Sequence, residues 1–295
     1  MKKPLFLGTA TAVVTPFFEN QIDLAALDRL LEQQLSAKID AIVVCGTTGE
    51  ASTLTIEEKT ALWQHTASYL GGRAKMIAGI GTNDTRTSAA LAMLAKEAGA
   101  DGLLAVTPYY NKCSQEGLAR HYEAIADATD LPLITYNVPS RTGVDLKPET
   151  CVRLMRHERI NGIKEAGGNA VRMAKLRSLC GASFAVWSGN DDQIVAMMAL
   201  GASGVISVLS NVRPRAVKAM TDACLRGDFQ TAAKLQTDYL PLIEALFSDV
   251  NPVPVKAALA ALGICREEVR LPLCPMSSDA RTRLHAALLT CPELS

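Results

Sequence analysis

A lysine ends one of the short apolar runs of this chain, in the segment Ile160-Asn-Gly-Ile-Lys-Glu165. If that run is a strand, Lys164 shares a face with Gly162, and the missing side chain of Gly162 leaves room beside the amine. An apolar environment lowers the pKa of a lysine, and the resulting free amine attacks carbonyl carbons. Lys164 is therefore our candidate nucleophile for Schiff-base chemistry, although a lysine at a strand end can also extend its ammonium group into water.

Hydroxyl groups follow another apolar run, in the turn Gly46-Thr-Thr-Gly-Glu50. The two glycines allow a tight turn with free backbone N–H groups, and Thr47 and Thr48 add hydroxyl donors. Such a turn can hold a small carboxylate. The same residues also suit a plain connection between a strand and a helix.

Two tyrosines and an arginine follow further apolar runs. Tyr110 lies in Thr107-Pro-Tyr-Tyr-Asn111, where a phenol can transfer protons or simply form an aromatic rim. Tyr136 ends the next run, and Arg141 follows in the same loop. The guanidinium fork of Arg141 suits a carboxylate, although surface arginines are common. Together the amine, phenols, hydroxyls and arginine favour Schiff-base chemistry on a small carboxylated substrate.

These groups need elements that bring them together, and the chain alternates short apolar runs with longer amphipathic segments. Apolar runs without polar alternation are typical of strands covered on both faces. They predict strands over residues 7–14, 41–45, 76–80, 102–106, 133–136, 162–164, 185–188 and 204–207. The 3.6-residue periodicity predicts helices over residues 24–36, 85–97, 114–128, 148–156, 170–179, 191–200 and 213–226, and a capping box at residues 55–58 opens another.

Strands that alternate with helices predict an α/β protein, a (β/α)₈ TIM barrel over residues 1–227. A doubly wound open sheet is the competing fold, but it usually has a glycine-rich loop after its first strand, and Ala12-Val-Val-Thr-Pro16 has no glycine. Helices predicted over residues 229–247, 254–262 and 278–289 form a C-terminal extension, residues 228–295, which we expect to pack on the barrel. In such a barrel the working side chains meet at the carboxyl ends of the strands.

Composition excludes several other classes of protein. Thirty basic residues balance thirty acidic ones, so charge does not indicate a nucleic acid or membrane partner. No apolar stretch is long enough to span a bilayer, and the apolar run near the N-terminus is too short for a signal peptide, so we expect a cytoplasmic protein. The eight cysteines are scattered without metal-ligand spacing, which predicts free thiols and no metal site.

The sequence resembles the dihydrodipicolinate synthase family, also called hydroxytetrahydrodipicolinate synthases. This family belongs to a superfamily of class I pyruvate aldolases that includes N-acetylneuraminate lyase. The resemblance covers nearly the whole chain, and its motifs occur in the family's order. They are Gly46-Thr-Thr-Gly-Glu50, Val106-Thr-Pro-Tyr-Tyr-Asn111, Tyr136-Asn-Val-Pro-Ser-Arg-Thr-Gly143, Gly162-Ile-Lys-Glu-Ala166 and Asn251-Pro-Val-Pro-Val-Lys256.

The resemblance implies a catalytic role for four of these residues. Lys164 would form an imine with pyruvate, so that no other cofactor is needed. Tyr136 would act as general acid and base, and Thr47 would link it to Tyr110 of a neighbouring subunit. The protein would then be a homo-oligomer, with a tetramer made of two dimers as the expected form.

The resemblance also implies how the substrates are held. Thr48 would bind the pyruvate carboxylate, and Arg141 would bind the carboxylate of aspartate semialdehyde. Gly189 and Ile206 would line the pocket through their backbone. The product would be 4-hydroxy-tetrahydrodipicolinate, in the first committed step of diaminopimelate and lysine biosynthesis.

Regulated members of the family bind lysine at the dimer interface. The matching positions here are Ala51, Ser52, Lys59, Asn83, Thr87 and Tyr109. Those members typically carry a histidine where Lys59 stands and a carboxylate where Thr87 stands. The ammonium groups of a bound lysine would lose a partner and meet a like charge, at a cost on the order of 1–3 kcal/mol. We therefore expect weak or absent inhibition by lysine.

Other functions remain open on the sequence. A sugar-acid aldolase would use the same imine with a different aldehyde, but its members usually lack an arginine at the position of Arg141. A barrel that only binds a small metabolite is a second alternative. A phosphate-binding barrel is a third, and Ser207-Val-Leu-Ser-Asn211 lacks the glycine-rich turn that such a site normally uses.

Overall fold

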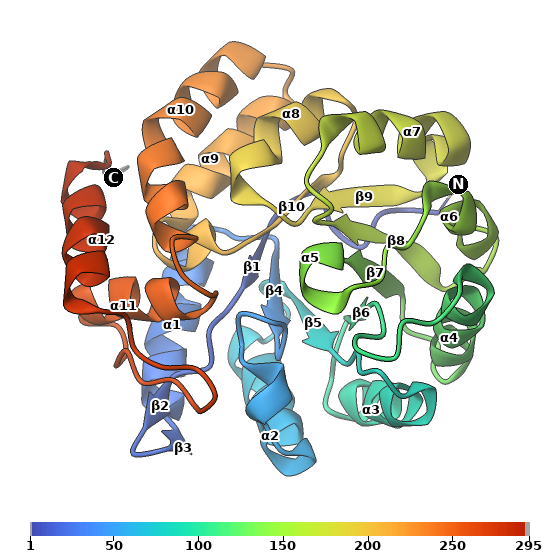
Figure 1. Cartoon of the computed structure of the whole chain (residues 1–295), viewed down its shortest axis with the longest axis horizontal. Coiled ribbons are helices and arrows are strands. Elements are labelled where there is room, and N and C mark those ends of the chain that lie inside the picture. Colours follow the sequence, from blue (N-terminus) through green and yellow to red (C-terminus); the bar gives the residue numbers. More distant parts are fainter. Residues whose placement is uncertain (1, 293–295) are drawn as a thin grey trace.

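The computed structural model describes residues 2–292, and its centre is a closed barrel of parallel strands (Figure 1). The strands are β1 (Gly8–Ala12), β4 (Ala41–Val44), β5 (Lys75–Gly79), β6 (Gly102–Val106), β7 (Leu133–Asn137), β8 (Ile160–Glu165), β9 (Ala185–Ser188) and β10 (Gly204–Ser207). They pair in sequence order from β4 to β10, and β1 pairs with both β10 and β4, which closes the barrel. The predicted barrel fold is confirmed.

Helices surround the barrel and cover the outer faces of the strands (Figure 1). They are α1 (Leu24–Ser36), α2 (Ile56–Leu70), α3 (Thr85–Glu97), α4 (Gln115–Asp127), α6 (Pro148–Leu154), α7 (Ala170–Cys180), α8 (Ile194–Ala199) and α9 (Pro214–Leu225). Side-chain caps start several of them. The predicted capping box of α2 is present, because Thr55 accepts from the backbone N–H of Glu58 while the Glu58 carboxylate accepts from that of Thr55.

The structure differs from the predicted elements where segments are short. The predicted helix over residues 191–200 is divided, since a 3₁₀ turn at Asp191–Gln193 precedes α8. A hairpin of β2 (Phe17–Phe18) and β3 (Gln21–Ile22) and the single-turn helix α5 (Pro139–Thr142) were not predicted. The hairpin strands have two residues each and α5 has a single turn, so neither is long enough to show a strand or helix periodicity.

Two apolar layers hold the barrel together. One lies between strands and helices, and the other fills the barrel interior with small or branched side chains such as Ala10, Val43 and Ile134. At the amino end of the strands, Phe6 stacks on Trp187 with ring centroids 5.0 Å apart. The interior is therefore a packed core, as is usual for this fold.

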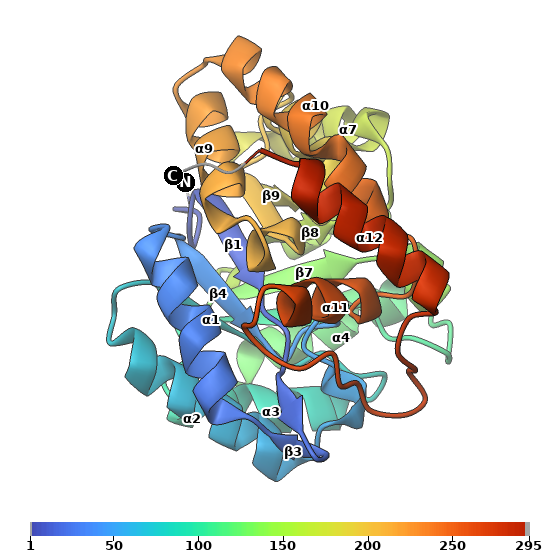
Figure 2. The same cartoon turned by 90° about the vertical axis from the view of Figure 1, so that its left-hand side faces the viewer.

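Three helices follow the barrel, namely α10 (Phe229–Leu246), α11 (Val253–Ala261) and α12 (Ser278–Thr290). Figure 2 shows α12 running beside α10, with α11 next to both. α10 also packs against α9, the last helix of the barrel. The division of the chain into units at residue 227 stays a prediction.

Candidate active site

A cavity of about 180 Å³ opens at the carboxyl ends of the strands. Six of the residues proposed from the sequence line it, and they come from four different strand ends and the loops behind them. They are Thr47, Thr48, Tyr136, Arg141, Lys164 and Gly189. The barrel thus brings together an amine, a phenol, two hydroxyls and a guanidinium group that are far apart in the chain.

Lys164 lies near the end of β8, and its side chain is 5% exposed. The pKa of its ammonium group is lowered to about 8, mainly by burial; the carboxylate of Asp191 opposes the shift, and the charge of Arg141 adds to it. Its Nζ atom is 4.4 Å from the centre of the Tyr136 ring, and the two residues are register partners on β8 and β7. More of this amine is therefore free near neutral pH than in an ordinary lysine, and it lies beside a phenol that can transfer protons.

Two glycines shape the space around Lys164, although not as the sequence suggested. A Cβ atom on Gly162 would overlap the carbonyl group of Ala185, so this glycine allows β8 and β9 to approach each other and leaves no gap beside the amine. A Cβ atom on Gly189 would lie 3.1 Å from Cε of Lys164 and 2.7 Å from Cβ of Ala166. Gly189 is thus the glycine that gives the lysine side chain its room.

Tyr136 and Thr47 are joined by a side-chain hydrogen bond. Burial raises the pKa of the Tyr136 phenol, whereas the Arg141 charge and the bond to Thr47 lower it. The phenol therefore keeps its proton at neutral pH but lies next to a hydroxyl group and a cation that favour its ionised form. Such a group can give and take a proton during a reaction.

The turn after β4 presents donors to the cavity. It is closed by the bonds Gly49 N–H to Gly46 O at 3.1 Å and Glu50 N–H to Thr47 O at 3.1 Å. Within residues 2–292, the N–H groups of Thr47 and Thr48 donate to no backbone or side-chain acceptor. The turn therefore leaves two backbone donors free, and their binding of a carboxylate stays a prediction.

Arg141 lies on α5, at the exposed rim of the cavity. α5 begins after Val138 and ends at Gly143, which has a positive φ of 69° and so turns the chain back after a single helical turn. This short helix holds the guanidinium group over the cavity mouth. A cation at that place attracts an anionic group that enters from solvent.

Two of the proposed residues lie outside the cavity. Tyr110 is 88% exposed, has a positive φ of 74°, and does not line the cavity of its own chain. Ile206, on β10, is fully buried in the barrel interior, and Val208 lines the cavity near it. The role of Tyr110 therefore depends on a second chain, and the contact of Ile206 with substrate stays a prediction.

Other groups at the site were missed by the sequence reasoning. Asn251, from the extension, lines the cavity and donates a hydrogen bond from Nδ2 to Oγ1 of Thr48 at 3.0 Å. Asp191, after β9, is buried and acts electrostatically on Lys164. In the sequence, Asn251 stands out only as part of a family motif, and no local pattern marks Asp191.

A neighbouring cavity of about 330 Å³ shares Thr47, Tyr136 and Arg141 with the first. Four residues of the predicted effector site also line it, namely Ala51, Ser52, Lys59 and Tyr109. Asn83 and Thr87 do not, and the Thr87 hydroxyl donates to Asp84 at 2.6 Å. Burial lowers the pKa of the Lys59 ammonium group, which forms no ion pair with a described carboxylate. The wall of this cavity therefore carries a cation without a described counter-charge.

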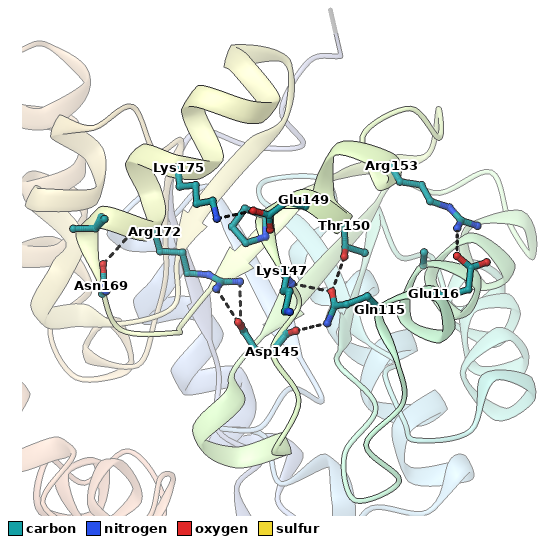
Figure 3. A pocket seen from close by; sticks show the side chains of 13 residues that line it. Gln115, Glu116, Asp145, Lys147, Glu149, Thr150, Arg153, Asn169, Arg172 and Lys175 are labelled. Carbon is teal, nitrogen blue, oxygen red and sulfur yellow. Dashed lines mark hydrogen bonds and ion pairs between the residues drawn. The ribbon is translucent and has the colours of Figure 1, made fainter.

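A larger hollow of about 840 Å³ lies on the flank of the barrel between α4, α6 and α7 (Figure 3). Most of the charged side chains that line it are paired, as in the pairs Arg172–Asp145 at 3.1 Å and Lys175–Glu149 at 2.5 Å. Arg172 also donates from Nε to Glu165 at 2.7 Å. This arginine thus connects the lining of the hollow to the residue that follows Lys164.

Neither a metal centre nor a membrane segment is found in the described part of the chain. Among residues 2–292, no three His, Cys, Asp or Glu side chains gather in an arrangement that could hold a metal ion. No helix in that range has both the length and the apolar character needed to cross a bilayer.

A (β/α)₈ barrel with a buried, electrostatically tuned lysine beside a tyrosine has the site of a Schiff-base aldolase. Residues 5–290 match the model of the dihydrodipicolinate synthetase family, and the chain belongs to that family. The 4-hydroxy-tetrahydrodipicolinate synthase of Geobacter sulfurreducens is 49% identical over 284 residues, which cover 96% of this chain and 98% of that protein. The family predicted from the sequence is confirmed.

Solved structures give the same result. The dihydrodipicolinate synthase from Aquifex aeolicus is 44% identical, with a TM-score of 0.95 over 96% of this chain and 97% of its own. The chloride-inhibited dihydrodipicolinate synthase from Acinetobacter baumannii, complexed with pyruvate, is 43% identical, with a TM-score of 0.95 over 97% of this chain and 99% of its own.

Proposed function

We propose that this protein condenses pyruvate with L-aspartate 4-semialdehyde through a Schiff base on Lys164, and so forms 4-hydroxy-tetrahydrodipicolinate. The observation that carries the proposal is the lysine itself, buried at a cavity with a pKa lowered to about 8 and 4.4 Å from the ring centre of Tyr136. Family membership supports the substrates, since the matched relatives are named for this synthase. The reaction would supply a cyclic precursor for diaminopimelate and lysine synthesis.

The first step is imine formation. The free amine of Lys164 attacks the keto carbon of pyruvate, and Tyr136 protonates the oxygen that leaves as water. Thr47, bonded to the phenol, passes protons between Tyr136 and the Tyr110 of a neighbouring subunit. The iminium then loses a proton from the methyl carbon and becomes an enamine, with no other cofactor required.

The donor turn would hold the carboxylate of pyruvate during these steps. The hydroxyl of Thr48 and the N–H groups of Thr47 and Thr48 face no described acceptor, so they can bind an anion. Gly189 leaves space for the carbon skeleton next to Cε of Lys164. A carboxylate fixed at this place directs the keto carbon toward the amine.

The second half of the reaction joins the two substrates. The enamine carbon attacks the aldehyde carbon of the semialdehyde, whose carboxylate Arg141 would bind at the rim of the cavity. The amino group of the adduct then attacks the iminium carbon, and the bond to Lys164 breaks. The ring closes, the free enzyme returns, and the only by-product is the water released during imine formation.

The sugar-acid aldolase alternative receives less support. It would use the same lysine and tyrosine, but the matched relatives are named as synthases, and Arg141 stands at the cavity rim where a second carboxylate would arrive. A substrate panel separates the two functions. Aspartate semialdehyde should be consumed with pyruvate, whereas N-acetylmannosamine should not.

The assembly and location are part of the same proposal. We infer that Tyr110 serves catalysis from a neighbouring chain, because it is exposed and does not line the cavity of its own chain. We infer a homotetramer built from two dimers, and the exposed side chains of Val171 and Leu200 support a further contact. A cytoplasmic location agrees with the eight free cysteines, since free thiols are typical of a reducing compartment.

The direct test is to trap the imine. The protein is incubated with pyruvate, reduced with sodium borohydride, digested and analysed by peptide mass spectrometry, with Lys164→Ala as control. An adduct on Lys164 that is absent from the variant establishes the imine. No adduct on folded protein with fresh pyruvate would overturn the proposed chemistry and favour a barrel that only binds a metabolite.

A further inference from the structure

The C-terminal extension reaches into the cavity through one side chain. Asn251 lies between α10 and α11, is 7% exposed, and lines the cavity together with Thr48. Its Nδ2 donates to Oγ1 of Thr48 at 3.0 Å, across a sequence separation of 203 residues. A hydrogen bond therefore joins the barrel and the extension at the turn that presents the carboxylate donors.

This bond determines what the Thr48 hydroxyl can do. A hydroxyl has one hydrogen to donate, whereas its oxygen can accept. Because the amide nitrogen of Asn251 only donates, the oxygen of Thr48 is used as the acceptor and its hydrogen stays free. No described residue accepts that hydrogen, so it is available to a ligand in the cavity.

A second contact holds the same turn from the same side. Lys256 of α11 is fully buried and forms an ion pair with Glu50, the last residue of the turn. The backbone N–H of Arg270 donates to the other carboxylate oxygen of Glu50 at 3.0 Å. Glu50 has a positive φ of 55°, a conformation that non-glycine residues adopt only when their surroundings hold them there. The extension thus holds both the hydroxyl and the end of the turn.

We propose that Asn251 is a positioning residue of the pyruvate site, which keeps the hydrogen of the Thr48 hydroxyl directed at the substrate carboxylate. The inference rests on the proposed function, in which this turn binds pyruvate. Asn251 contacts no reacting atom; it acts through Thr48. It follows that the C-terminal extension forms part of the substrate site rather than a cover on the barrel.

The test reverses the direction of the hydrogen bond. Asn251→Asp keeps the shape of the side chain but can only accept, so it takes the single hydrogen of Thr48 away from the substrate. We expect the pyruvate KM to rise about tenfold or more, because a hydrogen bond to a charged group is lost. The kcat should stay within about threefold and the semialdehyde KM within about twofold, as when binding alone is removed.

Asn251→Leu distinguishes loss of the fixed orientation of the Thr48 hydroxyl from loss of its hydrogen to another acceptor. The leucine neither donates nor accepts, so the Thr48 hydroxyl can still turn toward the carboxylate but is no longer held. Its pyruvate KM should lie between those of the wild type and Asn251→Asp. If Asn251 instead accepts from Thr48, the aspartate would preserve the bond, the pyruvate KM would stay at the wild-type value, and the inference would be wrong.

A double variant excludes direct repulsion between the new carboxylate and pyruvate. Thr48→Val removes the hydroxyl, and adding Asn251→Asp to it should change the pyruvate KM by less than about twofold, since coupled residues are not additive. A further large rise in the double variant would show that the aspartate acts on pyruvate directly, which would overturn the positioning role.

Two controls complete the design. Asn211→Asp places the same change at a buried asparagine that bridges Ala12 and Val208, and it should leave the pyruvate KM within about twofold. An equal rise there would mean that any such change disturbs the site, which would contradict the inference. If circular dichroism shows that Asn251→Asp is unfolded, a double-mutant cycle of Asn251→Leu and Thr48→Val replaces it. Additive effects of these two substitutions on the pyruvate KM would contradict the positioning role of Asn251.

The same experiments keep the two proposals apart. Absence of a Lys164 adduct or of condensation in the wild type would contradict the proposed function itself. A wild type that traps pyruvate and turns over, together with an unchanged pyruvate KM in Asn251→Asp, would contradict only the role of Asn251.

Discussion

Two lysines of this protein are buried, and they differ in what their ammonium groups face. Lys256 is 0% exposed, forms an ion pair with Glu50, and donates to the carbonyl oxygen of Glu268 at 2.7 Å. Lys164 is 5% exposed, faces the cavity, and forms no ion pair with a described carboxylate. Both ammonium groups lie against an aromatic ring, at 4.1 Å from the centre of Phe17 and 4.4 Å from the centre of Tyr136.

The comparison shows that burial alone does not make a nucleophile. Burial lowers the pKa of both lysines, but Glu50 favours the charged form of Lys256 and its hydrogen bonds occupy the nitrogen. Lys164 lacks such a partner, so its lone pair is available to an electrophile. Lys256 instead ties the extension to the donor turn, which is a structural use of the same side chain.

The largest expected effect is on activity, at Lys164. Lys164→Ala should lower kcat/KM on the order of 10³-fold or more, because no other amine lines the cavity. Its thermal midpoint should be equal to or above that of the wild type, since the substitution removes a buried charge without a close partner. Steady-state kinetics with pyruvate and aspartate semialdehyde, beside calorimetry of both proteins, checks this. If Lys164→Ala kept its turnover or lost much of its stability, the proposed difference between the two lysines would be wrong.

The opposite pattern is expected at Lys256. Lys256→Met leaves the carboxylate of Glu50 buried without its cation, and the free energy of unfolding should fall by about 3–5 kcal/mol. Denaturant unfolding monitored by circular dichroism measures the change.

The matched control removes both charges. The pair Glu50→Gln with Lys256→Met should recover most of the stability, because no charge is then left unpaired. A double variant as unstable as Lys256→Met alone would show that packing, and not the ion pair, explains the loss.

These contacts also mark what the sequence could and could not predict. Apolar runs and helical periodicity predicted the barrel, and the position of Lys164 at the end of a strand predicted its role as candidate nucleophile. Both signals are local, so one stretch of sequence contains them. The bond between Asn251 and Thr48, by contrast, joins residues 203 positions apart, and neither local pattern indicates the other.

Gly162 shows a second limit of prediction from the sequence. Its place two residues before Lys164 correctly predicted that they share a face, but the reason for a glycine there lies on the neighbouring strand, at Ala185. A single strand cannot show which neighbour approaches it. The residue that makes room for the lysine, Gly189, comes from the loop after β9, and only the closed barrel brings it next to Cε of Lys164.

The pH dependence of stability tests the same difference between the two lysines through a smaller effect. With a native pKa of about 8 against an ordinary value of 10.5, Lys164 binds fewer protons in the folded than in the unfolded state between these values. Stability should therefore rise with pH through that window. The contribution is lost in Lys164→Ala, so the difference between the two unfolding free energies should change from about pH 8 to 10.5. A constant difference across this range would mean that Lys164 titrates normally.

The rate of imine formation should depend on pH through the protonation of the same amine, that of Lys164. The rate at which borohydride traps pyruvate at subsaturating concentration should increase from pH 6, with a midpoint near pH 8, and then level off as the amine of Lys164 loses its proton. Single-turnover trapping at a series of pH values measures it. A midpoint near the ordinary value of 10.5 would show that burial does not tune this lysine.

The smallest effect concerns a third lysine, Lys59, which lines the neighbouring cavity. Free L-lysine at about 1 mM should lower the rate by less than about twofold, because its ammonium groups would meet the Lys59 cation and find no carboxylate at Thr87, whose hydroxyl is bonded to Asp84. Initial rates over a lysine titration, with Lys59→Ala as control, measure this. Strong inhibition at sub-millimolar lysine would contradict the prediction. Inhibition by lysine of Lys59→Ala but not of the wild type would show that the Lys59 cation prevents lysine from binding. That substitution removes the like charge and leaves Thr87 unchanged.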